Sequence, residues 1–307
     1  MRTAYLTHPA CLRHDMGDRH PESPARLRAI DDSLHAAHLA DLLDRREAPR
    51  VTRAQLLRVH DAAYVDSIEA ASPATGWVVL DPDTRMNPYT LEAARRAAGG
   101  AVHAVDIVMR GEAANAFVAV RPPGHHATRD QAMGFCIFNN VAVAAAHALA
   151  AHGLERVAIV DFDVHHGNGT EAIFRDEPRV MLCSTFQHPY YPFSGADSGS
   201  DHIVNVPLPA GTAGAAYREA FAARIRPRLD AFRPQCVFCS AGFDGHREDG
   251  MAQFALVEAD YAWITGQVMD VAARHAGGRI VSVLEGGYDP GSLGRSVAAH
   301  IGMLAAG

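Results

Sequence analysis

The sequence predicts an α/β protein with a mainly parallel β-sheet. Short apolar and β-branched runs, which are typical of buried strands, alternate along the chain with alanine-rich segments whose apolar residues recur every three or four positions. No repeat, low-complexity tract or linker-like stretch divides the 307 residues, of which 48% are hydrophobic. A chain of this length and composition can bury a large core, so we expect a single domain over residues 1–307.

Six runs are predicted to be strands because they are short, apolar and rich in β-branched residues. In chain order they are Ala116–Val120, Arg156–Val160, Val180–Ser184, His202–Val206, Gln235–Ser240 and Arg279–Leu284. Helical segments with three- and four-residue apolar spacing lie between most of them. The clearest are Leu91–Met109, Asn140–Ala151, Ala215–Phe232 and Val257–His275.

Chemically active side chains are concentrated directly after four of these strands. A tandem histidine pair follows the first strand, an Asp-x-Asp-x-His run follows the second, and a lone aspartate and a tyrosine follow the last two. Open parallel sheets bind ligands beyond the carboxyl ends of their strands, so these groups are expected at one rim. The residues are His125 and His126, Asp161 to His165, Asp244, and Tyr288.

The Asp-x-Asp-x-His run has the pattern of a metal site. Alternate side chains of an extended segment share a face, which puts Asp161, Asp163 and His165 on the same side. With Asp244 arriving from another strand, carboxylates and an imidazole would meet and leave a position open for water, as in a catalytic zinc site. The alternative is a surface turn with capping aspartates.

The tandem histidines follow a rigid Pro-Pro-Gly turn, which suits a pair that must be held in place for proton transfer. Asp161 and Asn168 are candidates for fixing the tautomers of the rings. The phenol of Tyr288 follows two glycines and could donate to a carbonyl oxygen as it becomes an oxyanion, although a tyrosine in a loop can also simply pack.

Composition excludes several classes of function. The net charge is −7 and no cluster of basic residues occurs, which argues against nucleic-acid binding and mildly favours cationic substrates. No apolar stretch approaches the length of a membrane span, and five scattered cysteines argue against a disulfide framework, so we expect a cytoplasmic protein. Cys236 and Cys239 have C-x-x-C spacing but lie in a predicted buried strand, which favours packing over metal binding. A homo-oligomer is compatible with the sequence.

Six segments together resemble the histone deacetylase superfamily, which includes acetylpolyamine amidohydrolases and bacterial deacetylase-like amidohydrolases. They occur in the expected order and span almost the whole chain. The segments are His20–Arg26, Arg121–His126, Gly134–Asn140, Asp161–Thr170, Ser240–Asp244 and Leu284–Tyr288. The resemblance implies an arginase-like three-layer fold with a mostly parallel eight-stranded sheet.

The resemblance also implies roles for particular residues. The zinc ligands would be Asp163, His165 and Asp244. His126 would act as the general base and acid, and His125 would be its electrostatic partner. Tyr288 would polarise the carbonyl group of the substrate. Structural potassium would be held through backbone oxygens of the Asp161–His165 segment, with help from Ser184. The substrate channel would be formed by Phe135 and Tyr191 with Gly134 and Gly286, although either aromatic residue could instead belong to the core. Asn168 and the His-Pro-Glu-x-Pro segment are more similar to the class II and bacterial branch, whereas Gly250 stands where similar proteins often carry proline.

Three functions remain open at this point. The substrate implied is an acetylated amine, either an acyl-lysine, which we favour, or a small acetylated polyamine. A polyamine-selective enzyme is expected to carry an acidic residue at the channel rim, for which Asp83, Glu248 and Asp249 are candidates. A catalytically inactive relative that only binds acylated ligands would have lost a metal ligand, a tandem histidine or the tyrosine, and all of these are present.

Overall fold

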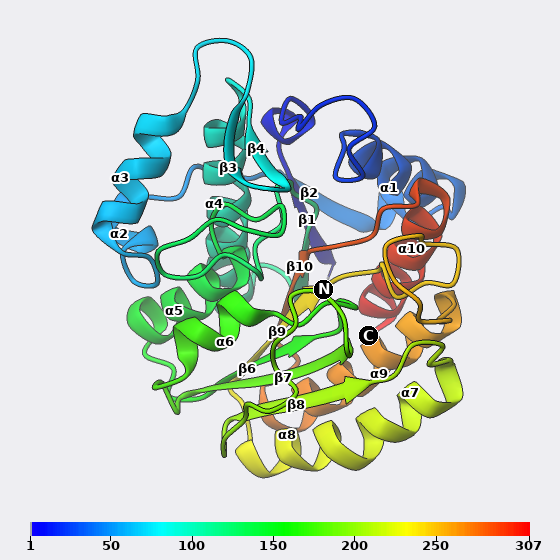
Figure 1. Cartoon of the computed structure of the whole chain (residues 1–307). Coiled ribbons are helices and arrows are strands. Elements are labelled where there is room, and N and C mark those ends of the chain that lie inside the picture. The colour runs from blue at the N-terminus through cyan, green and yellow to red at the C-terminus, as the bar shows by residue number, and fades with distance from the viewer. Residues whose placement is uncertain (1) are drawn as a thin grey trace.

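An eight-stranded sheet crosses the middle of the protein in a computed structural model, which describes residues 2–307 (Figure 1). Its strands are β1 (Thr3–Thr7), β2 (Leu43–Glu47), β5 (Asn115–Val118), β6 (Val157–Asp161), β7 (Val180–Gln187), β8 (Ile203–Leu208), β9 (Cys236–Ala241) and β10 (Ile280–Leu284). They are ordered β2-β1-β5-β10-β9-β6-β7-β8, and every pair is parallel. The predicted α/β class and the eight-stranded parallel sheet are therefore confirmed.

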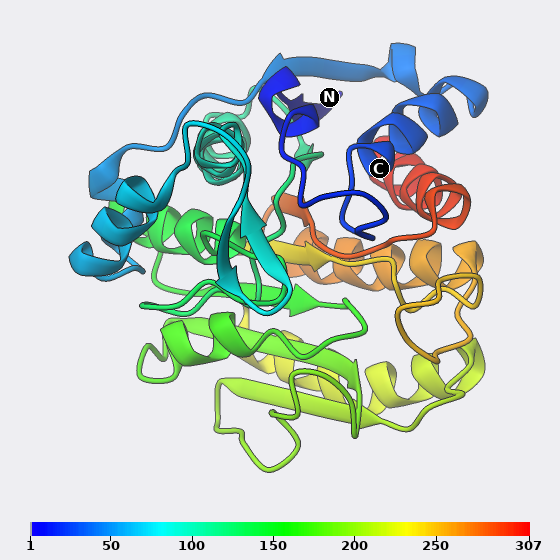
Figure 2. The same ribbon diagram turned by 45° about the horizontal axis from the view of Figure 1, so that its top comes forward.

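Helices cover both faces of the sheet, which makes a three-layer arrangement (Figure 2). One face carries α4 and α5, which pack on each other, and the other carries α1, α9 and α10. The longer helices are α1 (Ala25–Ala36), α3 (Ala62–Ala71), α4 (Thr90–Met109), α5 (Asn140–His152), α9 (Glu258–His275) and α10 (Pro290–Ala306). Shorter ones are α2 (Arg53–Leu56), α6 (Asn168–Phe174), α7 (Gly214–Ala220) and α8 (Arg226–Phe232).

All six predicted strands form, with ends displaced by a few residues. The central strands are buried along their full length because helices cover both of their faces, which explains their continuous apolar sequences. The two strands of this sheet that were not predicted are β1 and β2. Strand β2 reads Leu-Asp-Arg-Arg-Glu and lies at the sheet edge, where alternate side chains reach solvent, so no apolar run marks it.

The stretch predicted to be helical, Ala215–Phe232, is helical along its length, but it is not a single α-helix. A turn of π-helix, Phe221–Ile225, separates α7 from α8. Pro227 stands in the first turn of α8, where it has no backbone N–H to continue the α-helical hydrogen-bond ladder. Apolar spacing alone predicts the face of this segment but not the interruption.

A small antiparallel hairpin of β3 (Val78–Asp81) and β4 (Thr84–Met86) stands apart from the main sheet. The backbone N–H of Phe135 donates to Thr84 Oγ1 at 2.9 Å, which ties this hairpin to the loop after the tandem histidines. The hairpin therefore forms part of the rim above the strand carboxyl ends. No helix within residues 2–307 combines the length and the apolar character that crossing a membrane requires.

Candidate active site

Asp163, His165 and Asp244 converge just beyond the carboxyl ends of β6 and β9, and all three are buried. His165 Nδ1 lies 3.0 Å from Asp163 Oδ1 and 3.2 Å from Asp244 Oδ2. One ligand atom from each residue falls within 4.8 Å of the others, so the group could hold a metal ion. Two carboxylates and one imidazole are a donor set that suits zinc.

The surroundings of these carboxylates fit a cation. Burial and the neighbouring Asp163 carboxylate raise the pKa of Asp244 to about 6. Asp244 Oδ2 is buried, and apart from His165 Nδ1 at 3.2 Å, which does not reach it in good hydrogen-bond geometry, it has no partner among the described residues, so a cation would stabilise it. Two glycines bring the backbone close to the carboxylate oxygens. A Cβ added at Gly286 would lie 2.0 Å from Asp244 Oδ2, and one added at Gly242 would lie 2.0 Å from Asp163 Oδ2, so neither position has room for a side chain.

His125 and His126 lie side by side with ring centroids 4.1 Å apart, but their surroundings differ. Burial by itself would lower the pKa of His125, yet the carboxylates of Asp161 and Asp163 raise it well above its usual value. Burial, together with the neighbouring rings of His125 and His165, holds the pKa of His126 well below its usual value. The surroundings therefore favour the protonated form of His125 and the neutral form of His126.

Hydrogen bonds fix the orientation of both rings. His125 Nδ1 donates to Asp161 Oδ2 at 2.9 Å, and His126 Nδ1 lies 2.7 Å from Asn168 Oδ1. Because a neutral imidazole has one N–H, donation from His126 Nδ1 to the amide oxygen leaves the lone pair on Nε2. His126 lines the cavity described below, so this arrangement offers a proton acceptor to a bound substrate.

Glu285 supports the same loop from beneath. Its Oε2 accepts hydrogen bonds from the backbone N–H groups of Gly124, at 2.6 Å, and His125, at 3.0 Å. Burial raises the pKa of Glu285 to about 7, against the opposing effects of His125 and of the Gly124 hydrogen bond. The sequence places this glutamate in a segment of the resemblance, but nothing in its spacing indicates that it braces the tandem-histidine loop.

A cavity of about 300 Å³ opens above these groups. Phe135, Tyr191 and Gly134 line it, together with the ring of Tyr288, which lies edge-on to Phe135 with centroids 5.6 Å apart. Gly286 does not line the cavity; its N–H donates to Asp163 Oδ2 at 2.8 Å beneath it. The complete lining is Asp83, His126, Gly134, Phe135, His165, Tyr190, Tyr191, Phe193, Met251 and Tyr288.

Sequence reasoning missed three of these lining residues. Tyr190 stacks on His165 with ring centroids 5.8 Å apart, and Met251 accepts a hydrogen bond from the Tyr190 hydroxyl through its backbone oxygen. Phe193 is 75% exposed at the mouth of the cavity. The adjacent aromatic residues in Tyr190-Tyr-Pro-Phe193 are the signal that could have indicated an aromatic wall.

The three acidic residues considered for the rim occupy different positions. Asp83 lines the cavity from the β3–β4 hairpin. Glu248 instead pairs with Arg295 at 2.6 Å and is not part of the lining. Asp249 is only 4% exposed, and its Oδ2 accepts hydrogen bonds from the backbone N–H groups of Tyr288, at 2.6 Å, and Asp289. Glu248 therefore lies outside the cavity lining, and Asp249 braces the tyrosine loop.

Asp161 and Ser184 lie opposite each other in the register of β6 and β7. Both side chains are fully buried, and Ser184 Oγ has no hydrogen-bond partner among residues 2–307. Asp161 Oδ1 accepts from the backbone N–H of Asp163 at 3.1 Å. An unpartnered hydroxyl oxygen beside a buried carboxylate is compatible with a hard monovalent cation at this position.

Comparison with known proteins agrees with this fold and site. The family model described as "Histone deacetylase domain" matches residues 20–304. Because that match covers most of the chain, the protein belongs to the histone deacetylase family, whose members include deacetylase-type amidohydrolases.

Individual relatives are similar over nearly the full length. The chain is 41% identical to a histone deacetylase-like amidohydrolase of Pseudomonas aeruginosa, over 94% of this chain and 82% of the relative. It is 36% identical to a probable deacetylase of Archaeoglobus fulgidus, with the same two coverages. The crystal structure of the HDA15 HD domain superposes with a TM-score of 0.94 and 37% identity, over 99% of this chain and 90% of that one.

Proposed function

We propose that residues 1–307 act as one zinc-dependent deacetylase domain that hydrolyses the N-acyl amide of a lysine-like amine. The single observation that carries the proposal is the meeting of the Asp163, His165 and Asp244 ligand atoms beside the neutral ring of His126. These three residues would hold the zinc ion. When bound, zinc would polarise the acyl carbonyl and lower the pKa of a water molecule toward about 7.

The protein's own residues would supply the remaining steps. Nε2 of His126 takes a proton from the attacking water, since its Nδ1 is occupied by Asn168. The phenol of Tyr288 donates a hydrogen bond to the acyl oxygen as negative charge develops on it. His126 then passes its proton to the leaving amine nitrogen, and acetate and a free amine result.

His125 would act electrostatically rather than as the base. Its ring is held between Asp161 and the metal-binding carboxylates, which favour its protonated form. A fixed positive charge next to His126 keeps that neighbour neutral and able to accept a proton.

We further propose a structural potassium ion at Asp161 and Ser184, supported by the unpartnered Ser184 hydroxyl.

An acyl-lysine is the substrate that the rim favours. Apart from Asp83, the lining is aromatic, small, sulfur-containing or part of the catalytic group, so a neutral peptide backbone can rest on it. A small acetylated polyamine would leave a second cationic nitrogen at the rim, and Asp83 is the acidic side chain that lines it. A single carboxylate on one side of the mouth makes polyamine turnover the second candidate.

The decisive experiment removes and restores the metal. The purified protein is treated with a chelator, reloaded with one equivalent of zinc, and assayed with an acetyl-lysine peptide and with acetylputrescine. The released acetate is measured with a coupled assay, because acetylputrescine already carries a free amine that an amine-reactive dye would label. We expect activity to disappear and return with zinc, and Asp244→Ala to remain inactive and retain no zinc at this site. Unchanged zinc content in both Asp163→Ala and Asp244→Ala would overturn the ligand assignment.

A further inference from the structure

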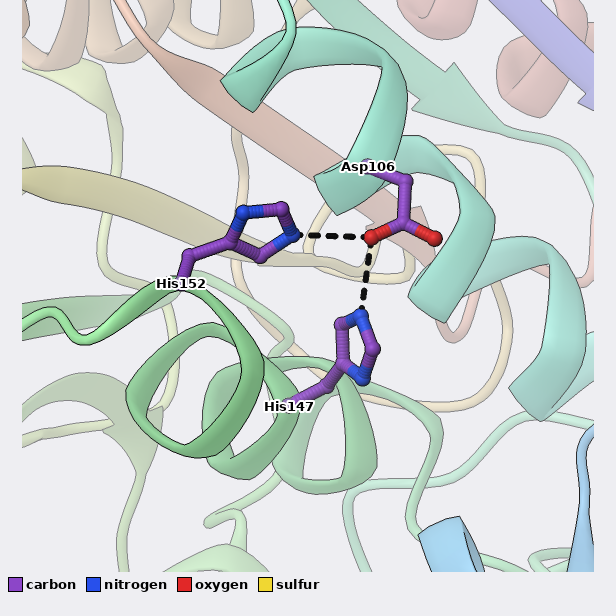
Figure 3. Close-up of side chains that lie close together, drawn as sticks. All are labelled: Asp106, His147 and His152. Carbon is purple, nitrogen blue, oxygen red and sulfur yellow. Dashed lines mark hydrogen bonds and ion pairs between the residues drawn. The ribbon is translucent and has the colours of Figure 1, made fainter.

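A second group of potential metal ligands lies between α4 and α5 (Figure 3). Asp106 of α4 faces His147 and His152 of α5, and its Oδ1 lies 2.9 Å from His147 Nε2 and 2.8 Å from His152 Nε2. Within residues 2–307 this is one of two groups of three histidine, cysteine or acidic residues whose ligand atoms converge in this way.

The group is remote from the active site. Helix α4 ends at Met109 and leads into the start of β5, and α5 ends at His152 and leads into the start of β6. In a parallel sheet with helical crossovers, the carboxyl ends of the helices lie at the edge where strands begin, whereas the catalytic groups lie where strands end. The proposed hydrolysis makes no use of Asp106, His147 or His152.

We propose that Asp106, His147 and His152 form a second binding site for a divalent transition-metal cation such as zinc, which joins α4 to α5. Two imidazole nitrogens and one carboxylate oxygen suit zinc and its neighbours, and they are a poor set for magnesium, which prefers oxygen ligands. The side chains are 8–22% exposed, so an ion can enter from solvent and keep water as a further ligand.

All three ligand atoms lie within 4.8 Å of one another, and the two nitrogen-to-oxygen separations need only a small change to accept an ion. Zinc lies about 2.0–2.2 Å from nitrogen and oxygen ligands, which places tetrahedral ligand atoms roughly 3.3 Å apart. The nitrogen-to-oxygen distances of 2.8 and 2.9 Å are a few tenths of an ångström shorter. Side-chain rotation on the partly exposed helix surface can supply this difference.

Arg58 competes with the ion. Its Nη1 donates to His147 Nδ1 at 2.8 Å, and since a guanidinium only donates, that nitrogen must hold a lone pair. The proton of the neutral ring is then on Nε2, where it points at Asp106. For the ion to bind, this proton must move to Nδ1 and Arg58 must turn away. Arg58 lines a surface cavity of about 380 Å³, which gives its side chain room to do so.

The competition makes a specific prediction. Arg58→Gln removes the cationic donor and offers an amide oxygen that can accept from His147 Nδ1, the arrangement that normally supports a metal-bound histidine. Changes in such outer partners alter metal affinity by about 10–100-fold, so zinc should bind Arg58→Gln at least about 10-fold more tightly than the native chain.

Zinc titration by calorimetry, with metal content measured by elemental analysis, tests the proposal. The native protein should bind a second, weaker equivalent of zinc that raises its melting temperature, and magnesium should not replace it. Asp106→Asn and His152→Gln should each lose that equivalent while keeping deacetylase activity. His103→Gln, a histidine change on α4 outside the group, is the matched control and should keep it.

Two results would overturn the second site. One is a second equivalent that persists in both Asp106→Asn and His152→Gln, which would place it on other surface histidines. The other is the absence of any second equivalent in both the native chain and Arg58→Gln. The difference of one equivalent between native and Asp106→Asn protein does not depend on the proposed catalytic zinc, so failure of either proposal leaves the other testable.

Discussion

His126 Nδ1 and Asn168 Oδ1 are 2.7 Å apart, which joins the loop after β5 to the first residue of α6. The partner of the His126 ring is the neutral amide of Asn168 and not a carboxylate, so the hydrogen bond orients the ring without placing a negative charge beside it. The other histidine of the pair has a charged partner, because His125 donates to the Asp161 carboxylate.

Replacing this amide by a carboxylate should shift the pH dependence of the enzyme. In Asn168→Asp the new negative charge raises the pKa of His126, because it favours the protonated ring. The base works when neutral, so the acidic limb of kcat/KM should move to higher pH. Asn168→Ala is the control, since it loses the hydrogen bond without adding charge and should lower kcat without that upward movement. Superimposable pH profiles for Asn168→Asp and the native chain would contradict the assignment of His126 as base.

The hydroxyl of Tyr288 should be needed for turnover but not for folding. Tyr288→Phe keeps the ring contact with Phe135 and removes a single donor to the acyl oxygen, so kcat should fall by about 10²–10³-fold while KM changes less. Steady-state kinetics with an acetyl-lysine peptide measure this directly. A loss below about threefold would mean that the phenol only packs.

The buried carboxylate of Glu22 should be a large contributor to stability. It contacts two buried arginines, Arg121 through an Nη2-to-Oε2 bond of 2.6 Å and Arg26 at 3.1 Å, and also His14. Removing one partner from such a cluster leaves buried positive charge uncompensated, so Glu22→Gln should lose about 3–5 kcal/mol of unfolding free energy. Chemical denaturation near neutral pH gives this value.

The same contribution has a defined pH dependence. Burial by itself would raise the pKa of Glu22, but Arg121 and His14 hold it well below its usual value. A carboxyl whose pKa is depressed by folding stabilises the native state above its unfolded pKa, and that stability is lost as pH falls. The difference between native and Glu22→Gln protein should therefore be constant near neutral pH and shrink below about pH 4.5. A difference that grows on acidification would be incompatible with an ionised Glu22.

Asp83 should affect cationic substrates more than neutral ones. In Asp83→Asn, kcat/KM for acetylputrescine should fall while the value for an acetyl-lysine peptide changes little, because the second nitrogen of the polyamine loses its acidic neighbour. High salt should weaken the native preference for the same reason. Glu248→Gln, which alters an acidic residue outside the cavity, is the matched control. An equal loss of kcat/KM for both substrates would show that Asp83 supports the hairpin and does not select cationic substrates.

Much of the fold could be predicted because the central strands are buried on both faces. β6 and β9 have nearly continuous apolar sequences, and each strand gives way to polar and charged residues where the segment that carries the candidate site residues begins. Edge strand β2 could not be found in this way, since its pairing with β1 uses backbone groups and its side chains are mostly polar. Backbone pairing leaves no mark on side-chain composition.

The sequence predicts the parts of the site whose residues are close together along the chain. It does not predict which side chains of the surrounding loops fold onto the site. Asp163 and His165 are two residues apart, so their common face follows from the alternation of an extended segment. The positions of Asp249 and Met251 depend on how the loop after Asp244 turns. From the sequence, Asp249 could either bind a cationic substrate or support the protein backbone. Its hydrogen bonds to the backbone N–H groups of Tyr288 and Asp289 show that it supports the tyrosine loop.

The strand order also determines how the active site should respond to partial unfolding. β10, β9 and β6 are flanked by strands on both sides, whereas β2 and β8 form the two edges. Native proteins open locally at edges, termini and loops, while the amides of central strands exchange with solvent only when the whole domain opens. Amide hydrogens of β6 and β9 should accordingly exchange with deuterium at the rate set by global unfolding. The residues that follow these strands would then keep their geometry until the domain itself unfolds, so fraying of β2 or β8 under mild heat or denaturant should leave the enzyme active.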